Sequence, residues 1–169
     1  KASLNNLLLS NPGFHAARLY LILLSWQQNA IDTPLIINNS IDLYPNQSAF
    51  RLTAARFYLE KQDYQAAENS LLNIQPTSDN LSELLQMRAV IRQKNNKHQL
   101  AVEDYTSILQ LSPDRGDIYI ALGISLEALN QNKQALLSFK KAEQDRRLST
   151  RQLQFVRNKI QLYSQQSQG

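Results

Sequence analysis

The sequence predicts an all-α protein in which antiparallel helix hairpins stack into a superhelix. The first observation is composition: 43% of the 169 residues are hydrophobic and only 4 are glycine and 5 proline, so good helix formers dominate. The second is that apolar residues recur at helical spacing between short breaks rich in Asn and Pro. The third is that small and aromatic residues return with a period of about 34 residues. A chain of stacked helical repeats explains all three.

The period is clearest between residues 82 and 147. The later hairpin there reads Tyr119-x2-Leu122-Gly123, followed by Ala135-x3-Phe139. The earlier hairpin carries residues of the same kind one period before, namely Ala89, Ala101, Tyr105 and Ile108 in place of Gly123, Ala135, Phe139 and Ala142. This pattern resembles that of the tetratricopeptide repeat (TPR) family. The resemblance implies helix pairs held close by small residues, and a role as a binding scaffold.

The repeat period divides the chain into a series of hairpins within one predicted domain, residues 1–169. Asn11-Pro12-Gly13 ends the first apolar segment, and Asp32-Thr33-Pro34 begins a helix inside the first full repeat. The expected order is a half repeat at 1–11, repeats at 14–45, 46–79, 80–113 and 114–147, and a capping helix at 149–165.

Local signals for helix ends repeat with the same period. Asn46, Asn80 and Asp114 precede three apolar segments, and we expect each of them to cap the helix that follows. In the turns inside the hairpins, equivalent positions of successive repeats are occupied by Gln62, Asn96 and Asn130. Asparagine tolerates the left-handed conformation that ends many helices, so this pattern predicts left-handed turn residues.

The sequence contains no motif for catalysis or for a cofactor. The two histidines, His15 and His98, are far apart, and neither has a metal ligand at helical spacing. There is no cysteine, and the isolated glycines form neither a phosphate-binding loop nor a nucleophile elbow. The chain is therefore predicted not to be an enzyme, and to bind no metal, cofactor or small-molecule substrate.

In the TPR family the first helix of each repeat lines a concave groove. Carried over position by position, the resemblance implies an aliphatic row flanked by arginines, formed by Arg18, Ile22, Trp26, Leu52, Arg56, Val90, Ile120 and Ile124. Such a row suits a peptide or helix segment of a protein partner. The alternative is that several of these side chains pack between repeats. The residues with which chaperone-binding relatives hold a C-terminal carboxylate are not reproduced.

A second candidate surface is basic, in a chain with a net charge of +4 and a pI near 9.4. Its residues gather near the C-terminus: Arg146, Arg147, Arg151, Arg157 and Lys159. An acidic protein, an anionic lipid or no partner at all is expected at this basic face rather than nucleic acid. The reason is that few aromatic residues other than Phe155 and Tyr163 alternate with the charges.

The C-terminal part adds a second resemblance. The segments 111–116, 122–129 and 148–162 are similar to the C-terminal repeat domain of the N-type biogenesis proteins of mannose-sensitive haemagglutinin (MSHA) type IV pili. This implies a periplasmic domain, an inner-membrane anchor upstream of Lys1 and a pilus-assembly component as partner. No apolar run reaches the ~18 residues of a membrane span. The alternative is a cytosolic TPR adaptor or regulator, associated with nucleic acid through the basic face.

Overall fold

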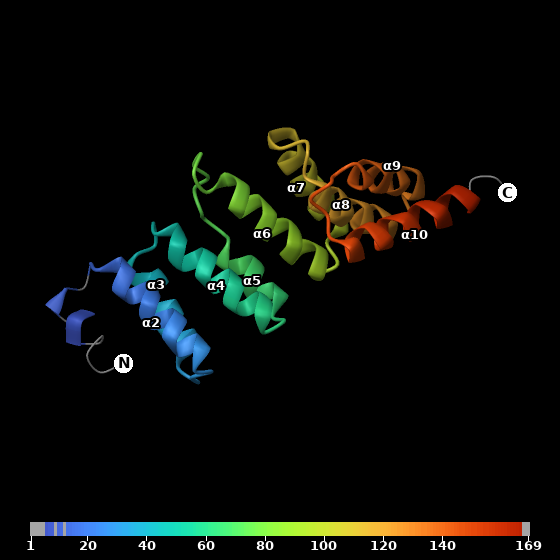
Figure 1. Cartoon of the computed structure of the whole chain (residues 1–169). Helices are drawn as coiled ribbons and strands as arrows, with labels where there is room; N and C mark the ends of the chain where they lie inside the picture. The colour runs from blue at the N-terminus through green and yellow to red at the C-terminus, as the bar shows by residue number, and fades with distance from the viewer. Residues whose placement is uncertain (1–5, 9, 12, 167–169) are drawn as a thin grey trace. The chain divides into compact units, whose positions relative to one another are not determined.

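Helices follow one another along the chain in the computed structural model, which describes residues 6–8, 10–11 and 13–166 (Figure 1). No strand occurs in these ranges, so the predicted all-α class is confirmed. The predicted half repeat at 1–11 falls largely outside the described residues. The helices are α2 (His15–Gln27), α3 (Thr33–Leu43), α4 (Ser48–Glu60), α5 (Tyr64–Ser70), α6 (Leu81–Lys94), α7 (His98–Leu111), α8 (Gly116–Ala128), α9 (Asn132–Glu143) and α10 (Thr150–Gln166).

The helices of the chain fall into two compact units. The N-terminal unit is Lys1–Gln75 and contains α2 to α5. The C-terminal unit is Pro76–Gly169 and contains α6 to α10. Each unit has its own hydrophobic core. The predicted superhelix over the whole chain stays a prediction.

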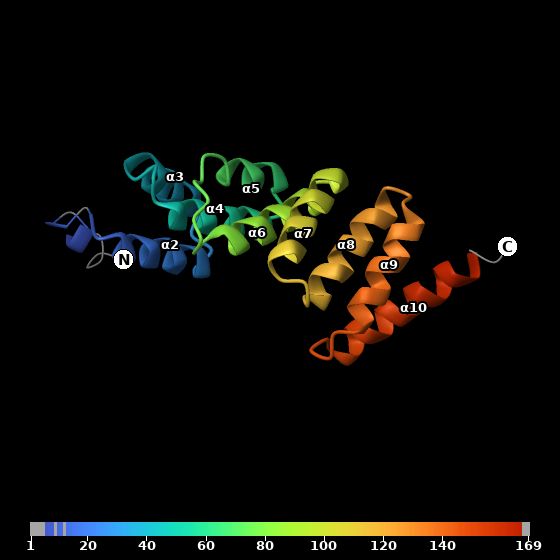
Figure 2. The ribbon, with the colours of Figure 1, turned by 90° about the horizontal axis from the view of Figure 1, so that it is seen from above.

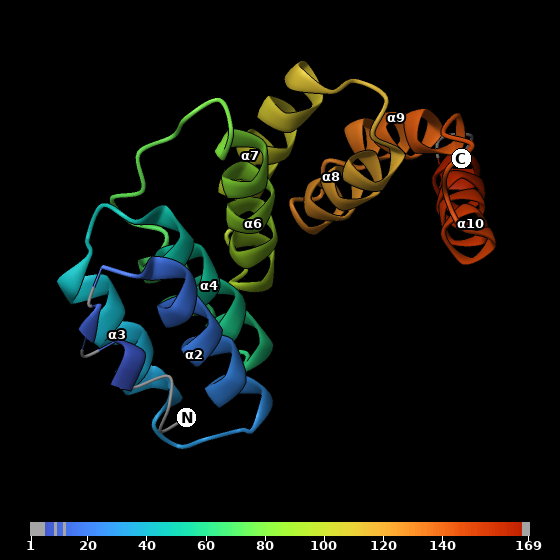
Figure 3. The same cartoon turned by 60° about the vertical axis from the view of Figure 1, so that its left-hand side comes forward.

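In the N-terminal unit, α2 and α3 form one hairpin and α4 and α5 form the next, and α2 also contacts α4 (Figure 3). The core between these helices contains Ile22, Ile37 and Phe50. The short helix α5 is stabilised at its start by Asp63, whose carboxylate accepts a hydrogen bond from the backbone N–H of Ala66 at 3.0 Å.

In the C-terminal unit, the hairpins α6–α7 and α8–α9 stack, and α10 packs against α9 (Figure 2). Ala89, Ala101 and Ala135, the small residues of the repeat pattern, are fully buried. Gly123 is small for a reason that the pattern did not show. A Cβ atom at this position would lie 2.6 Å from the ring of Phe139, so the glycine accommodates an aromatic ring.

The turns confirm the predicted left-handed residues, whereas the helix starts contradict the predicted caps. Gln62, Asn96 and Asn130 all have a positive φ near 60°. The N-cap residues of α4 and α8, however, are Gln47 and Arg115, one position beyond Asn46 and Asp114. Asn80 is the N-cap of α6, but its side-chain oxygen accepts a hydrogen bond from the backbone of Thr77 in the preceding turn.

Candidate partner-binding site

Two of the predicted groove residues in the N-terminal unit are buried. Ile22 is 0% exposed and packs in the core with Ile37 and Phe50. Leu52, on α4, is also buried. Because α2 contacts both α3 and α4, the side of α2 that the repeat register assigned to an open groove is covered. Neither side chain is open to a partner in this structure.

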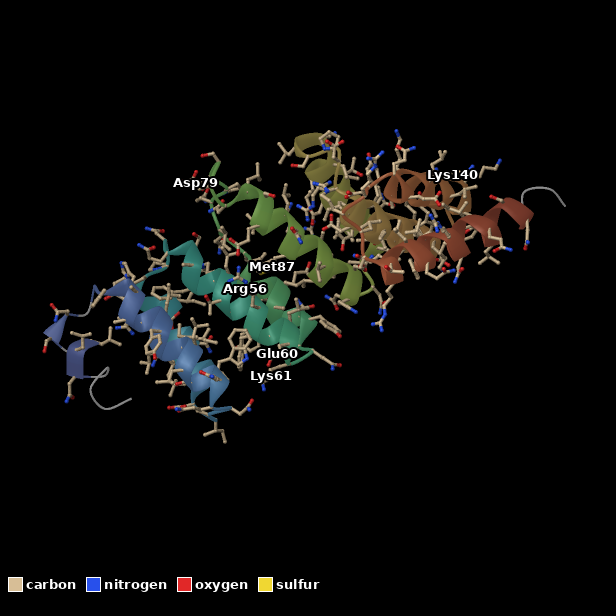
Figure 4. The ribbon with its side chains drawn as sticks, in the orientation of Figure 1. Arg56, Glu60, Lys61, Asp79, Met87 and Lys140 are labelled. Carbon is tan, nitrogen blue, oxygen red and sulfur yellow. The ribbon has the colours of Figure 1, made fainter. Side chains whose placement is uncertain are left out.

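Trp26 is anchored by its neighbours but remains partly exposed. Its indole Nε1 donates a hydrogen bond to Glu60 Oε1 at 3.1 Å, and its ring meets the ring of Phe57 edge to face. Nearby, Lys61 Nζ donates to Asn29 Oδ1, so two side-chain bonds join the ends of α2 and α4 (Figure 4). These contacts surround a pocket of about 330 Å³, lined by Leu23, Trp26, Gln27, Asn29 and Glu60.

The two arginines predicted for the groove have different surroundings. Arg18 is half-buried, with its guanidinium carbon 5.4 Å from the centre of the Tyr44 ring, a cation–π contact. Arg56 is exposed on α4 (Figure 4). Arg18 therefore contributes to the packing of the N-terminal unit, whereas the position of Arg56 is compatible with binding a partner.

The groove residues of the C-terminal unit are more accessible. Val90 on α6 and Ile120 on α8 are half-buried, and Ile124 on α8 is 36% exposed. The side-chain amide of Gln93 joins the two helices, since its Nε2 donates to Ser125 Oγ at 2.7 Å and to the carbonyl of Ala121 at 2.8 Å. The three aliphatic side chains therefore lie on two helices that hydrogen bonds hold side by side.

Charged residues at the edges of α8 are paired within the unit. Arg115 donates to both carboxylate oxygens of Asp117 and to Gln86 on α6. At the other end of the helix, Glu127 Oε1 lies 2.5 Å from Lys159 Nζ on α10. Burial raises the pKa of Glu127, but the hydrogen bonds from Lys159 and Tyr163 outweigh it, and the pKa lies below its ordinary value. The α6–α8 surface thus presents apolar side chains between neutralised charges.

A buried ion-pair triad in the same unit was not predicted. Asp104 on α7 is 3% exposed and accepts hydrogen bonds from Arg88 and Arg92 on α6, the shortest at 2.6 Å and 2.8 Å. The neighbouring Tyr105 donates to Gln93 Oε1. Burial, and secondarily the negative charge of Asp104, raise the pKa of Tyr105 above its ordinary value. The signal in the sequence was the pair Arg88 and Arg92, one turn apart at positions where the other repeats have apolar residues.

The five residues of the predicted basic face differ in their ion-pair partners. Arg157 pairs with Glu143 on α9 at 3.1 Å, whereas Lys159 pairs with Glu127 on α8, so two neighbouring cations of α10 point to different helices. Arg147 pairs with Asp145. Within the described part of the chain, Arg146 and Arg151 are exposed and form no ion pair. Arg147, Arg157 and Lys159 are therefore compensated within the fold, and Arg146 and Arg151 carry the charge that remains.

Asp145 joins the loop after α9 to the start of α8. Its carboxylate accepts hydrogen bonds from the backbone and side chain of Arg147 and from the backbone N–H of Gly116. These bonds, chiefly the one from the Arg147 side chain, hold the pKa of the Asp145 carboxyl well below its usual range. Arg147 also donates to the backbone carbonyl of Asp114, so one guanidinium connects both loops.

No metal centre is found among the described residues, where no three His, Asp or Glu side chains lie close enough to share an ion. His15 instead packs edge to face against the rings of Tyr44 and Phe50. The helices of the described segments are also too short or too polar to cross a lipid bilayer.

Comparison with solved structures supports a TPR-type fold of helix hairpins. No protein-family model matches the chain, and no curated protein is significantly similar to it in sequence. YrrB, described as a TPR protein with an unusual peptide-binding site, superimposes with a TM-score of 0.76 at 12% identity, covering 98% of this chain and 84% of YrrB.

Structures of MamA show the same likeness. One MamA crystal structure gives a TM-score of 0.72 at 15% identity, over 88% of this chain and 85% of that chain. MamA AMB-1 gives 0.69 at 21% identity, over 80% and 75% of the two chains. At such low identities these comparisons establish the TPR-type fold alone.

Proposed function

We propose that this protein is a non-catalytic interaction scaffold that binds a peptide or helix segment of a partner protein. The observation that carries the proposal is the TPR-type fold, which extends over 98% of the chain in the comparison with YrrB. Helical hairpins of this type bury their own apolar faces on each other and leave one helix of each pair to face a ligand. The peptide-binding site described for YrrB is a precedent within the same fold.

The surface of α6 and α8 is the binding site in this proposal. Ile124, Ile120 and Val90 supply apolar anchors, and the ion pairs around them leave little net charge. Partly buried aliphatic side chains at the centre of an interface account for most of the binding energy in known complexes. An amphipathic segment that places Leu, Ile or Phe against Ile124 is the partner chemistry that this surface fits.

A peptide-selection experiment tests this proposal. Segments are selected on the wild-type protein from a random peptide library, and their affinities are then measured by fluorescence anisotropy. Ile124→Asp is expected to weaken binding by about 1–3 kcal/mol, because it places a charge at the centre of the apolar row. The matched control is Leu137→Asp, at an exposed leucine of α9. Equal loss in both variants, or no loss in Ile124→Asp, would exclude the α6–α8 surface.

We further propose that this scaffold is the periplasmic domain of a type IV pilus or related secretion-system biogenesis protein, anchored upstream of Lys1. The proposal rests on the resemblance to the MSHA biogenesis proteins noted above, which is confined to the short segments 111–116, 122–129 and 148–162. The full-length protein, fused to alkaline phosphatase, is expected to be active in the periplasm and to cross-link to a pilus-assembly component. Activity confined to a cytoplasmic reporter fusion would favour the cytosolic adaptor.

A further inference from the structure

A second concave site lies in the C-terminal unit, where the loop before α8 meets the end of α9. The pocket has a volume of about 490 Å³, within the range of sites that hold a ligand of several heavy atoms. Its walls come from two helices and from the loops at their ends: Pro113, Asp114, Gly116, Tyr119, Lys141, Gln144, Asp145, Arg146 and Arg147.

One wall of this pocket is fixed before any ligand arrives. Asp145 accepts a hydrogen bond from the backbone N–H of Gly116 at 2.9 Å and two from the Arg147 side chain at 2.8 and 2.9 Å. Arg147 in turn donates to the carbonyl of Asp114 in the opposite loop. Because both loops are held by the same side chains, little conformational entropy remains to be lost when a ligand binds.

Two cations of the pocket remain available for a ligand. Lys141, in the last turn of α9, and Arg146, in the loop that follows, are both exposed, and neither has an ion-pair or hydrogen-bond partner in the described part of the chain. Two carboxylates also line the pocket, and that of Asp145 is already paired with Arg147. The lining therefore combines a fixed wall with a net positive charge, since Lys141, Arg146 and Arg147 outnumber the carboxylates of Asp114 and Asp145.

We infer that this pocket binds an acidic segment of a protein partner, with a Glu or Asp carboxylate held between Lys141 and Arg146. The carboxylate and carbonyl of Asp114 can accept hydrogen bonds from the backbone N–H groups of such a segment, as can the carboxamide oxygen of Gln144. Nucleic acid fits less well, since it brings a continuous row of phosphates, whereas the pocket offers two cations that are unpaired among the described residues, Lys141 and Arg146. This site is separate from the α6–α8 surface and does not depend on the function proposed for it.

Binding of two defined peptides tests the inference. A fluorescent octapeptide of alternating Glu and Gly is compared with the same peptide carrying Gln for Glu. The wild-type protein is expected to bind the Glu peptide at least tenfold more tightly, and less tightly as salt is raised. Lys141→Glu combined with Arg146→Glu should lower the affinity for the Glu peptide at least tenfold.

A charge-matched variant separates the pocket from the general charge of the protein. Lys133 and Lys140 are exposed on the same helix, α9, but do not line the pocket. Lys140 is labelled in Figure 4. Replacing both by Glu changes the net charge by the same amount. This variant is expected to lose less than threefold in affinity for the Glu peptide. Circular dichroism confirms that each variant is folded.

Three outcomes would overturn the inference. Equal losses in the two charge-reversal variants would show that the attraction is diffuse. Equal binding of the Glu and Gln peptides would show that no carboxylate is recognised. Tighter binding of a single-stranded oligonucleotide with the same number of charges, lost in the Lys141 and Arg146 variant, would assign the pocket to nucleic acid.

Discussion

The carboxylate of Asp145 accepts a hydrogen bond from the backbone N–H of Gly116, 2.9 Å away and 29 residues earlier in the chain. The N–H groups in the first turn of a helix have no partner within the helix, so a carboxylate from a distant loop satisfies one of them here. The approach is so close that a Cβ atom at Gly116 would lie 2.5 Å from the Cβ atom of Asp145. Glycine at this position is thus required by a tertiary contact.

Gly116→Ala is therefore expected to lower the free energy of unfolding by about 1–3 kcal/mol, because the α9–α10 loop must move to relieve the overlap. Urea unfolding followed by circular dichroism measures the change. Gly13→Ala is the control, since a Cβ atom there meets nothing within 4 Å. A stability loss of the same size in both variants would show that the contact with Asp145 is not its cause.

Asp104→Asn should destabilise the protein by about 2–3 kcal/mol, because it leaves Arg88 and Arg92 without their shared carboxylate. The expected loss is smaller than for a fully buried pair, since the two arginine side chains are 34% and 19% exposed. Glu103→Gln removes the charge of the adjacent exposed residue of α7 and should leave the free energy of unfolding nearly unchanged. Urea unfolding of both variants measures the change. The midpoint should fall for Asp104→Asn and stay nearly the same for Glu103→Gln, while the dependence of the unfolding free energy on urea concentration stays constant.

Gln62→Gly is expected to raise the stability by about 0.5–1 kcal/mol. Gln62 adopts a φ of 60°, where a residue with a Cβ atom loses roughly 1–2 kcal/mol, more than the entropy that glycine adds to the unfolded chain. Gln131, with a φ of −88°, provides the contrast. Gln131→Gly should lower the melting temperature, whereas an increase in both variants would point to a cause other than the backbone conformation.

The raised pKa of Tyr163 predicts that the protein loses stability at alkaline pH. Burial, followed by the hydrogen bond and charge of Glu127, raises the pKa of its hydroxyl from 10.0 to about 12. The folded state therefore favours the protonated form, so this contribution is complete below pH 10 and is lost as the pH rises towards 12.

Tyrosinate absorbance at 295 nm, recorded against pH, checks this prediction. Tyr163→Phe should remove one late transition from the titration. Glu127→Gln should move that transition only part of the way towards pH 10, because burial of the ring remains the larger cause. A titration unchanged by Tyr163→Phe would contradict the assigned environment.

The sequence predicts the repeats well because they depend on residue size at fixed spacing. Ala89, Ala101, Ala135 and Phe139 are buried as the period indicates. The helix caps were not predictable in this way. A free N–H group at a helix start can bond to any acceptor that the folded chain brings near it, including one from a distant part of the sequence. At α8 this acceptor is Asp145, which no local motif connects with Gly116.

The candidate site was predictable only in part, for a related reason. In the first repeat Thr33 replaces the usual alanine, and both Thr33 on α3 and Ile22 on α2 are buried. The positions carried over from the later repeats had assigned Ile22 to an open groove. The basic residues were found by counting charges, but their partners lie on other helices. Arg157 and Lys159 are two residues apart, yet their ion pairs involve α9 and α8.

Phe139 is fully buried although it belongs to the last complete hairpin, and α10 provides its cover. The Tyr163 ring stacks parallel to it with centroids 6.4 Å apart, and the Phe155 ring meets it edge-on at 6.0 Å. Limited proteolysis within α10 would therefore expose an aromatic ring at the end of the hairpin and produce a fragment that self-associates and precipitates. A soluble expression fragment of the C-terminal unit should extend through Tyr163.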